Sequence, residues 1–196
     1  MSESARIRSF VALDLQKSVL VGVQTLQQQL ANTRADVRWV RPEGLHVTLK
    51  FLGAVAASQL EPVHRALAAA VGTHPVLHVE VQGLGAFPSL RRPRVLWVGL
   101  RGAGLVELAA RVDAALVPLG FAPEARAFTP HITLARVNTL RGWPRLEEAF
   151  TAHLDDAFGD CDINVVTIYR SDLQRAGAVY TPLWTIPLAE NKEGTL

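Results

Sequence analysis

A short pattern, His-x-Thr followed by an apolar residue, occurs twice in this chain of 196 residues. The first copy is His46-Val47-Thr48-Leu49 and the second is His131-Ile132-Thr133-Leu134. Both copies are rich in β-branched and apolar residues, which favours strands, and residues i and i+2 of a strand project from the same face. The pattern therefore predicts two strands, each with a histidine and a threonine on one face and core residues on the other.

The surroundings of the two copies also repeat. A strand-like apolar run and then a helix-like segment precede each copy, so that His46 follows Asp14 by 32 residues and His131 follows Leu100 by 31 residues. A single His-x-Thr carries little information, because a histidine in an apolar strand is usually a core residue. Two copies in matched contexts indicate an internal duplication in which two similar lobes each contribute one such strand.

The composition is that of a globular protein, with 49% hydrophobic and 19% charged residues. The net charge is +2, and basic residues gather at 34–41 and 91–94, which is compatible with a phosphate-bearing partner.

A single cysteine, Cys161, excludes an intramolecular disulfide and a multi-cysteine metal site. Residues 1–8 lack the apolar region of a signal peptide, and no apolar run is long enough to span a membrane. We therefore expect a cytoplasmic protein that does not bind membranes.

Periodicity predicts alternating strands and helices. We expect strands over 7–14, 37–40, 46–52, 76–86, 94–100, 131–136, 163–170 and about 179–187, with apolar helical stripes over 19–30, 60–71 and 105–116 and a short helix near 145–152. Ser58-Gln59-Leu60-Glu61 has the form of a capping box, Gly53 is expected to end its strand, and the tail 190–196 is expected to fray. Gly102 and Gly104 lack the third glycine of a dinucleotide fingerprint, so a loop is favoured there.

Two histidines that face one small space form an acid/base pair, because imidazole titrates near neutral pH. Displacement at phosphorus needs a base to activate water and an acid to protonate the departing oxygen. Each threonine can donate a hydrogen bond to a phosphate oxygen, and Arg136 can neutralise the developing charge. This chemistry requires no metal ion and no cofactor.

The segments His46-Val47-Thr48-Leu49-Lys50-Phe51-Leu52-Gly53 and His131-Ile132-Thr133-Leu134-Ala135-Arg136 closely resemble the twin motifs of the 2H phosphoesterases. Within them they resemble the RNA 2′,3′-cyclic phosphodiesterases, historically called 2′-5′ RNA ligases. The resemblance extends to 10–14, 93–99 and 180–183. It implies an α+β, LigT-like fold with two pseudo-symmetric lobes, whose antiparallel sheets flank a central cleft and carry helices outside. We expect a single bilobal domain over 1–196, with lobes of approximately 1–90 and 91–190 and strand exchange between them.

The same resemblance implies hydrolysis of an RNA terminal 2′,3′-cyclic phosphate to a 2′-phosphomonoester. By position, His46 matches the proton donor to the leaving 3′ oxygen and His131 matches the proton acceptor that activates water. Thr48 and Thr133 match the phosphate-binding threonines, and Arg136 matches a basic residue that contacts phosphate. Which histidine is the acid rests on the family alone, since the near-symmetric sequence offers no way to choose.

Several alternatives stay open from the sequence. The same histidines could catalyse reversible 2′-5′ RNA ligation, or the chain could be a non-catalytic module that binds RNA ends. The expected partner is RNA with a 2′,3′-cyclic phosphate end, and the protein is expected to be a monomer. Lys50 has the parity of His46, so it either contacts nucleic acid or is solvated. Core or surface roles are favoured for the remaining aromatic, basic and histidine candidates: Phe10, Trp39, Phe128, Arg91, Arg92, Arg94, His64, His74, His78 and His153.

Overall fold

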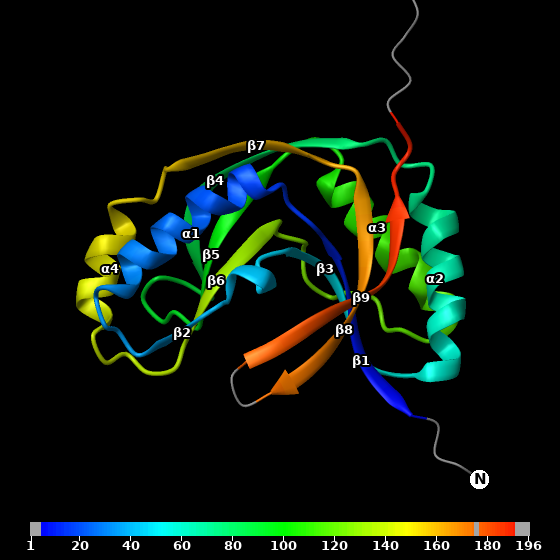
Figure 1. The fold of residues 1–196 in the computed structure, drawn as a ribbon, viewed down its shortest axis with the longest axis horizontal. Coiled ribbons are helices and arrows are strands. Elements are labelled where there is room, and N and C mark those ends of the chain that lie inside the picture. Colours follow the sequence, from blue (N-terminus) through cyan, green and yellow to red (C-terminus); the bar gives the residue numbers. More distant parts are fainter. Residues whose placement is uncertain (1–4, 175–176, 191–196) are drawn as a thin grey trace, which may run out of the picture.

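The computed structural model describes residues 5–174 and 177–190, and within these ranges it contains four α-helices and nine β-strands (Figure 1). In chain order the elements are β1 (Arg6–Leu13), α1 (Lys17–Ala31), β2 (Val37–Trp39), η1 (Pro42–Gly44), β3 (Val47–Ala56), α2 (Ala57–Val71), β4 (Leu77–Phe87), β5 (Val95–Arg101), α3 (Leu105–Leu116), η2 (Val117–Leu119), β6 (His131–Val137), α4 (Trp143–Thr151), β7 (Ala157–Ile163), β8 (Val165–Gln174) and β9 (Gly177–Pro187). Residues 191–196 of the tail expected to fray lie outside the described residues.

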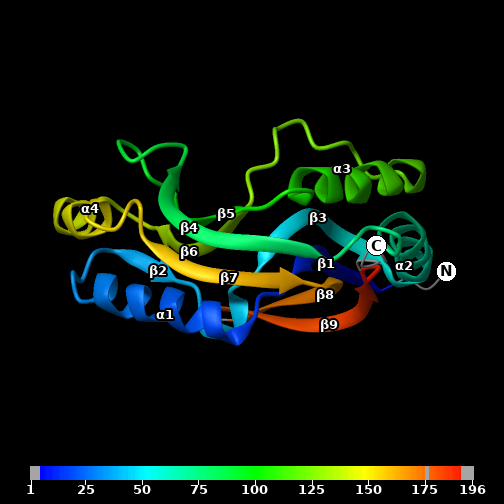
Figure 2. The same ribbon diagram turned by 90° about the horizontal axis from the view of Figure 1, so that it is seen from above.

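The strands form an antiparallel sheet in the order β7-β4-β5-β6-β3-β1-β8-β9, with β2 added to β6. Between β3 and β6 the only paired residues are Val47 and Ile132, so the sheet divides into two halves at this point. Helices α1 and α4 lie with the half that contains β7, whereas α2 and α3 lie at the other end (Figures 1 and 2). The predicted α+β fold, with two antiparallel lobes and outer helices, is confirmed.

The two halves of the sheet do not follow the order of the chain. Strands β1 and β3 lie with β8 and β9, while β4 lies between β5 and β7. Each half therefore takes strands from both of the segments 1–90 and 91–190, and the exchange of strands between these segments is extensive.

One strand was missed, and two local predictions were wrong. Strand β7 was not predicted, because its polar residues expose most of one face and only Cys161 and Ile163 are buried. The capping box is absent: α2 begins at Ala57, and no side chain caps its first turn. Strand β3 does not end at Gly53 but continues to Ala56, since this glycine adopts a φ of 72° that lets an irregular pair with β1 persist.

Each twin motif contains a β-bulge at the same position. In β3, Thr48 pairs with Ala12 and Lys50 with Val11, so Leu49 has no partner on β1. In β6, Thr133 pairs with Trp97 and Ala135 with Leu96, which leaves Leu134 without a partner on β5. An extra residue reverses the alternation of side chains that follows it.

The reversal decides which side chains share the histidine face. Phe51 and Arg136, each five residues after its histidine, both return to that face and line the same cavity. On the opposite face, Val47 and Ile132 are fully buried and belong to the continuous hydrophobic core of the protein.

Candidate active site

The two motifs meet at the centre of the sheet. Strands β3 and β6 run antiparallel and pair through Val47 and Ile132, the residues that follow the two histidines. The same register brings His46 level with Thr133, and Thr48 level with His131. A local pseudo-two-fold axis thus relates the histidine and threonine of one copy to those of the other.

A cavity of about 680 Å³ opens where the two half-sheets diverge. Four of the five predicted site residues line it: His46, Thr48, Thr133 and Arg136. His131 is not part of the lining, yet the two imidazoles interact, because a charge on His131 lowers the pKa of His46. The structure therefore brings the predicted acid, base, hydroxyl and guanidinium groups together.

His46 lies in an aromatic environment. Its ring stacks on Phe10 at a centroid distance of 4.8 Å and meets the edge of Tyr180 at 5.2 Å. The pKa of His46 is lowered to about 4, chiefly by burial and in smaller part by the charge of His131, whereas Asp14 and a backbone hydrogen bond with Gly44 oppose the shift. The free protein thus holds a neutral imidazole at neutral pH, with Nε2 3.1 Å from the Thr48 hydroxyl oxygen.

The Asp14 carboxylate acts on His46 through its charge and is held by two hydroxyl groups. Thr167 Oγ1 donates a hydrogen bond to it at 2.7 Å and the Tyr169 hydroxyl donates another at 2.6 Å. Burial, this hydrogen bond and the charge of Asp14 all raise the pKa of Tyr169, which keeps the phenol protonated as a donor. The arrangement fixes a negative charge whose effect favours the protonated form of His46.

His131 has a different set of neighbours. Its Nδ1–H donates to the carbonyl oxygen of Thr129 at 2.7 Å, which leaves Nε2 as the unprotonated nitrogen of the neutral ring. Phe87 meets the ring edge to face at 5.0 Å, and Trp97 lies at 6.2 Å. Burial lowers the pKa of His131, the Thr129 hydrogen bond opposes this, and the charge of Arg136 lowers it further.

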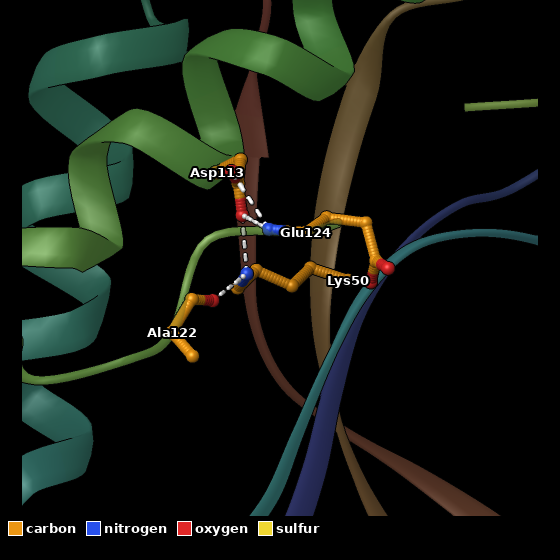
Figure 3. Close-up of polar contacts among 4 residues, drawn as sticks. All are labelled: Lys50, Asp113, Ala122 and Glu124. Carbon is orange, nitrogen blue, oxygen red and sulfur yellow. Dashed lines mark hydrogen bonds and ion pairs between the residues drawn. The ribbon is translucent and has the colours of Figure 1, made fainter. Parts of the chain in front are cut away.

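Lys50 does not lie on the histidine face, so the prediction that it shares the parity of His46 was wrong. The bulge at Leu49 turns Lys50 to the opposite side, where its side chain is 6% exposed and pairs with Asp113 of α3 (Figure 3). Lys50 Nζ also donates to the Ala122 carbonyl oxygen at 2.8 Å, and the Glu124 N–H donates to the Asp113 carboxylate. Lys50 therefore holds the segment that leads to the second motif.

The other histidines lie outside the cavity, as predicted. His78 and His153 are near carboxylates, with Nδ1 2.9 Å from Asp162 and 2.7 Å from Asp156, respectively. His74 is buried, and His64 stacks on Trp184. Among the described residues there is no group of three or more histidine, cysteine, aspartate or glutamate side chains that could hold a metal ion.

The aromatic candidates divide between core and cavity. Phe10 is buried, stacks on His46 and lines the cavity, Phe128 packs against the core, and Trp39 both packs against the core and lines the cavity. The sequence did not reveal Phe51 as a cavity residue, although it is 64% exposed there, because a strand without a bulge would bury it. The aromatic and hydroxyl groups that surround the histidines were likewise missed as contacts: Phe87, Trp97, Tyr169 and Tyr180.

The fold and the twin motifs are those of the 2H phosphoesterases, and the family comparison agrees. The model of the LigT-like phosphoesterases matches residues 13–97 and 100–180, so the chain belongs to this family. Within residues 5–174 and 177–190, no helix combines the length and the apolar character that crossing a membrane requires.

Relatives of known name cover nearly the whole chain. The RNA 2′,3′-cyclic phosphodiesterase of Methanothermobacter thermautotrophicus is 31% identical over 91% of this chain and 97% of its own length. The protein of the same name from Aeropyrum pernix is 33% identical over 85% of this chain and 94% of its own length.

Solved structures also match this chain over nearly its whole length. The protein TT0787 of Thermus thermophilus is 28% identical, with a TM-score of 0.80 over 93% of this chain and 98% of its own. LigT of E. coli in complex with 3′-AMP is 25% identical, with a TM-score of 0.73 over 94% of this chain and 99% of its own.

Proposed function

We propose that this protein hydrolyses the terminal 2′,3′-cyclic phosphate of RNA to a 2′-phosphomonoester by metal-free acid/base catalysis with two histidines. The proposal depends most on the antiparallel pairing of Val47 with Ile132. This pairing places the two His-x-Thr motifs side by side, next to a cavity that Arg136 lines. The names of the relatives support the substrate class. The cytoplasmic location and the monomeric state stay predictions.

In the proposed reaction, His131 Nε2 accepts a proton from water while the water oxygen bonds to phosphorus. The bond between phosphorus and the 3′ oxygen breaks, and His46 gives its proton to that oxygen. Thr48 and Thr133 hydroxyls donate hydrogen bonds to the non-bridging oxygens, and Arg136 neutralises their charge. Two surrounding charges support this assignment: Asp14 favours protonated His46, whereas Arg136 favours neutral His131.

The test is hydrolysis, in EDTA, of an oligoribonucleotide that ends in a 2′,3′-cyclic phosphate, with 2′- and 3′-phosphate products resolved. We expect a 2′-phosphate product and a loss of rate of about 10²-fold or more in both His46→Ala and His131→Ala, since each variant removes one proton-transfer group. His78→Ala is the matched control, because His78 is exposed on β4 outside the cavity, and it should retain the wild-type rate.

Three outcomes would contradict the proposal. A 3′-phosphate product would reverse the assignment of the broken bond. Binding of the RNA without turnover would point instead to an RNA-end binding module. Joining of the cyclic end to an added 5′-hydroxyl RNA, faster than hydrolysis, would point to 2′-5′ ligation.

A further inference from the structure

The two basic segments of the sequence meet in the folded protein. Strand β2 pairs with β6 so that Arg38 lies directly opposite Arg136. On the other side of β6, β5 pairs with the same residue through Val95, and the Val137 N–H donates to the Arg94 carbonyl oxygen at 3.0 Å. Arginines that lie 56 positions apart in the chain, at 38 and 94, are thus collected with Arg136 at one edge of the active site.

These three arginines line a groove of about 500 Å³. Arg38 and Arg136 line both this groove and the active-site cavity, so the two spaces adjoin each other. The rest of the lining includes the polar residues Asn138 and Thr139 and the apolar residues Pro93, Val137 and Leu140.

The groove carries positive charge that the protein does not balance. Arg38, Arg94 and Arg136 are exposed, and within the described parts of the chain none of them forms an ion pair. The carboxylate of Asp36 at this edge instead accepts hydrogen bonds from Thr139 at 2.7 Å and Asn138 at 3.2 Å, and Arg141 is 3.9 Å from it. Like charges directly opposite on neighbouring strands repel each other, so an anion between the guanidinium groups would stabilise this arrangement.

We propose that the groove binds the phosphodiester group that precedes the terminal nucleotide of an RNA strand. This inference rests on the proposed function, which places the terminal phosphate beside Thr133. In a strand whose 3′ end is the cyclic phosphate, every other phosphate lies on the 5′ side, so the chain must leave the cavity in that direction. Arg136 lies at the boundary between cavity and groove, and the guanidinium groups of Arg38 and Arg94 supply paired donors that match phosphate oxygens.

The consequence is a preference for length. A nucleoside 2′,3′-cyclic phosphate has no preceding phosphodiester, whereas a dinucleotide with the same terminal base has one. Arg94 lines the groove but not the active-site cavity, so we expect its contact with the preceding phosphodiester to be equally strong in the ground state and in the transition state. We therefore expect the dinucleotide to have a KM about tenfold lower, with a similar kcat.

The test compares these two substrates in wild type, Arg94→Gln, Arg94→Lys and the control Arg65→Gln, in which an exposed arginine of α2 is replaced. For Arg94→Gln, the ratio of kcat/KM between dinucleotide and mononucleotide should fall about three- to tenfold, with partial recovery in Arg94→Lys and no change in Arg65→Gln. The slope of log kcat/KM against log salt for the dinucleotide should become shallower by about 0.7 in Arg94→Gln, as expected for one lost phosphate contact.

Equal efficiency for both substrates in wild type would overturn the groove proposal, as would an equal loss for both substrates in Arg94→Gln. Absence of turnover for either substrate would instead refute the proposed hydrolysis. In that case, fluorescence anisotropy with labelled mono- and dinucleotide still decides the matter. Weaker dinucleotide binding in Arg94→Gln alone would support the groove, and unchanged binding would refute it.

Discussion

At the scale of single residues, the two histidines share a local geometry and differ in their charged neighbours. His131 donates to the carbonyl of the residue two positions before it, and the backbone partner of His46 is also two positions before it. Asp14, the residue after β1, acts on His46, and Arg136 acts on His131 from near the end of β6. The two histidines thus have equivalent backbone partners, and different charged neighbours make their electrostatic environments unlike.

The lowered pKa values predict an acidic optimum for kcat/KM, which reports the free protein. The proposed mechanism needs His46 protonated and His131 neutral, and with a pKa of about 4 only about one His46 in a thousand is protonated at pH 7. We expect kcat/KM to rise as pH falls from about 8 to about 6 and to peak below 6.5, the ordinary pKa of histidine. The profile of kcat should lie at higher pH, since a bound phosphate anion raises the pKa of His46.

The measurement is a pair of pH profiles for hydrolysis of the cyclic phosphate end. His78→Ala, with an exposed imidazole removed from β4, should give the same profiles as wild type. An optimum of kcat/KM at or above pH 7 would show that the proton donor of the free protein does not have a lowered pKa.

At the scale of the element, simple alternation predicts each motif strand only as far as its bulge. Alternation in the sequence correctly predicts that His46 and Thr48 share one face of their strand, and that His131 and Thr133 share one face of theirs. The faces on which Lys50 and Phe51 lie could not be predicted in this way. A bulge depends on the register with a neighbouring strand and leaves no local signal in the sequence. The family resemblance did identify Arg136, which no argument from alternation would have placed beside Thr133.

The bulge at Leu49 also predicts a structural role for Lys50. In Lys50→Met, the Asp113 carboxylate loses its buried cationic partner and the Ala122 carbonyl loses its donor, so we expect the free energy of unfolding to fall by about 1–3 kcal/mol. Burial alone would raise the pKa of Asp113, but the hydrogen bonds from Lys50 and the Glu124 backbone, together with the charge of Lys50, lower it.

Urea unfolding checks this expectation. Lys17→Met is the matched control, because Lys17 is exposed at the start of α1, and it should lose less than about 0.5 kcal/mol. If both variants lose the same free energy, the contacts of Lys50 contribute nothing specific.

At the scale of the whole molecule, the duplicated sequence predicts two lobes but not how the chain passes between them. The chain crosses repeatedly between the halves, since β1, β3, β8 and β9 lie in one half and β2, β4, β5, β6 and β7 in the other. Long-range pairing of this kind has no local signature, and the polar edge strand β7 has no clear alternation. We therefore propose that residues 1–196 form one bilobal domain, because each half of the sheet contains strands from both of the segments 1–90 and 91–190.

A single domain of this kind should unfold in one cooperative transition. Cys161 provides a test: it is the only cysteine, it is 3% exposed on β7, and burial raises the pKa of its thiol. With increasing urea, labelling of this thiol should have the same midpoint as the loss of far-UV circular dichroism. Labelling that begins at clearly lower urea would show that the half containing β7 opens on its own.

The two bulges bring different side chains to equivalent places in the site. A site with true two-fold symmetry would accept the five-membered phosphate ring equally well either way round, and attack would then expel the 2′ and the 3′ oxygen with equal frequency. Phe51 and Arg136 occupy the same place in the two copies, yet one presents a flat apolar ring and the other a cation. The two ways of seating the ring are therefore inequivalent, and a duplicated frame becomes able to distinguish between two neighbouring oxygens.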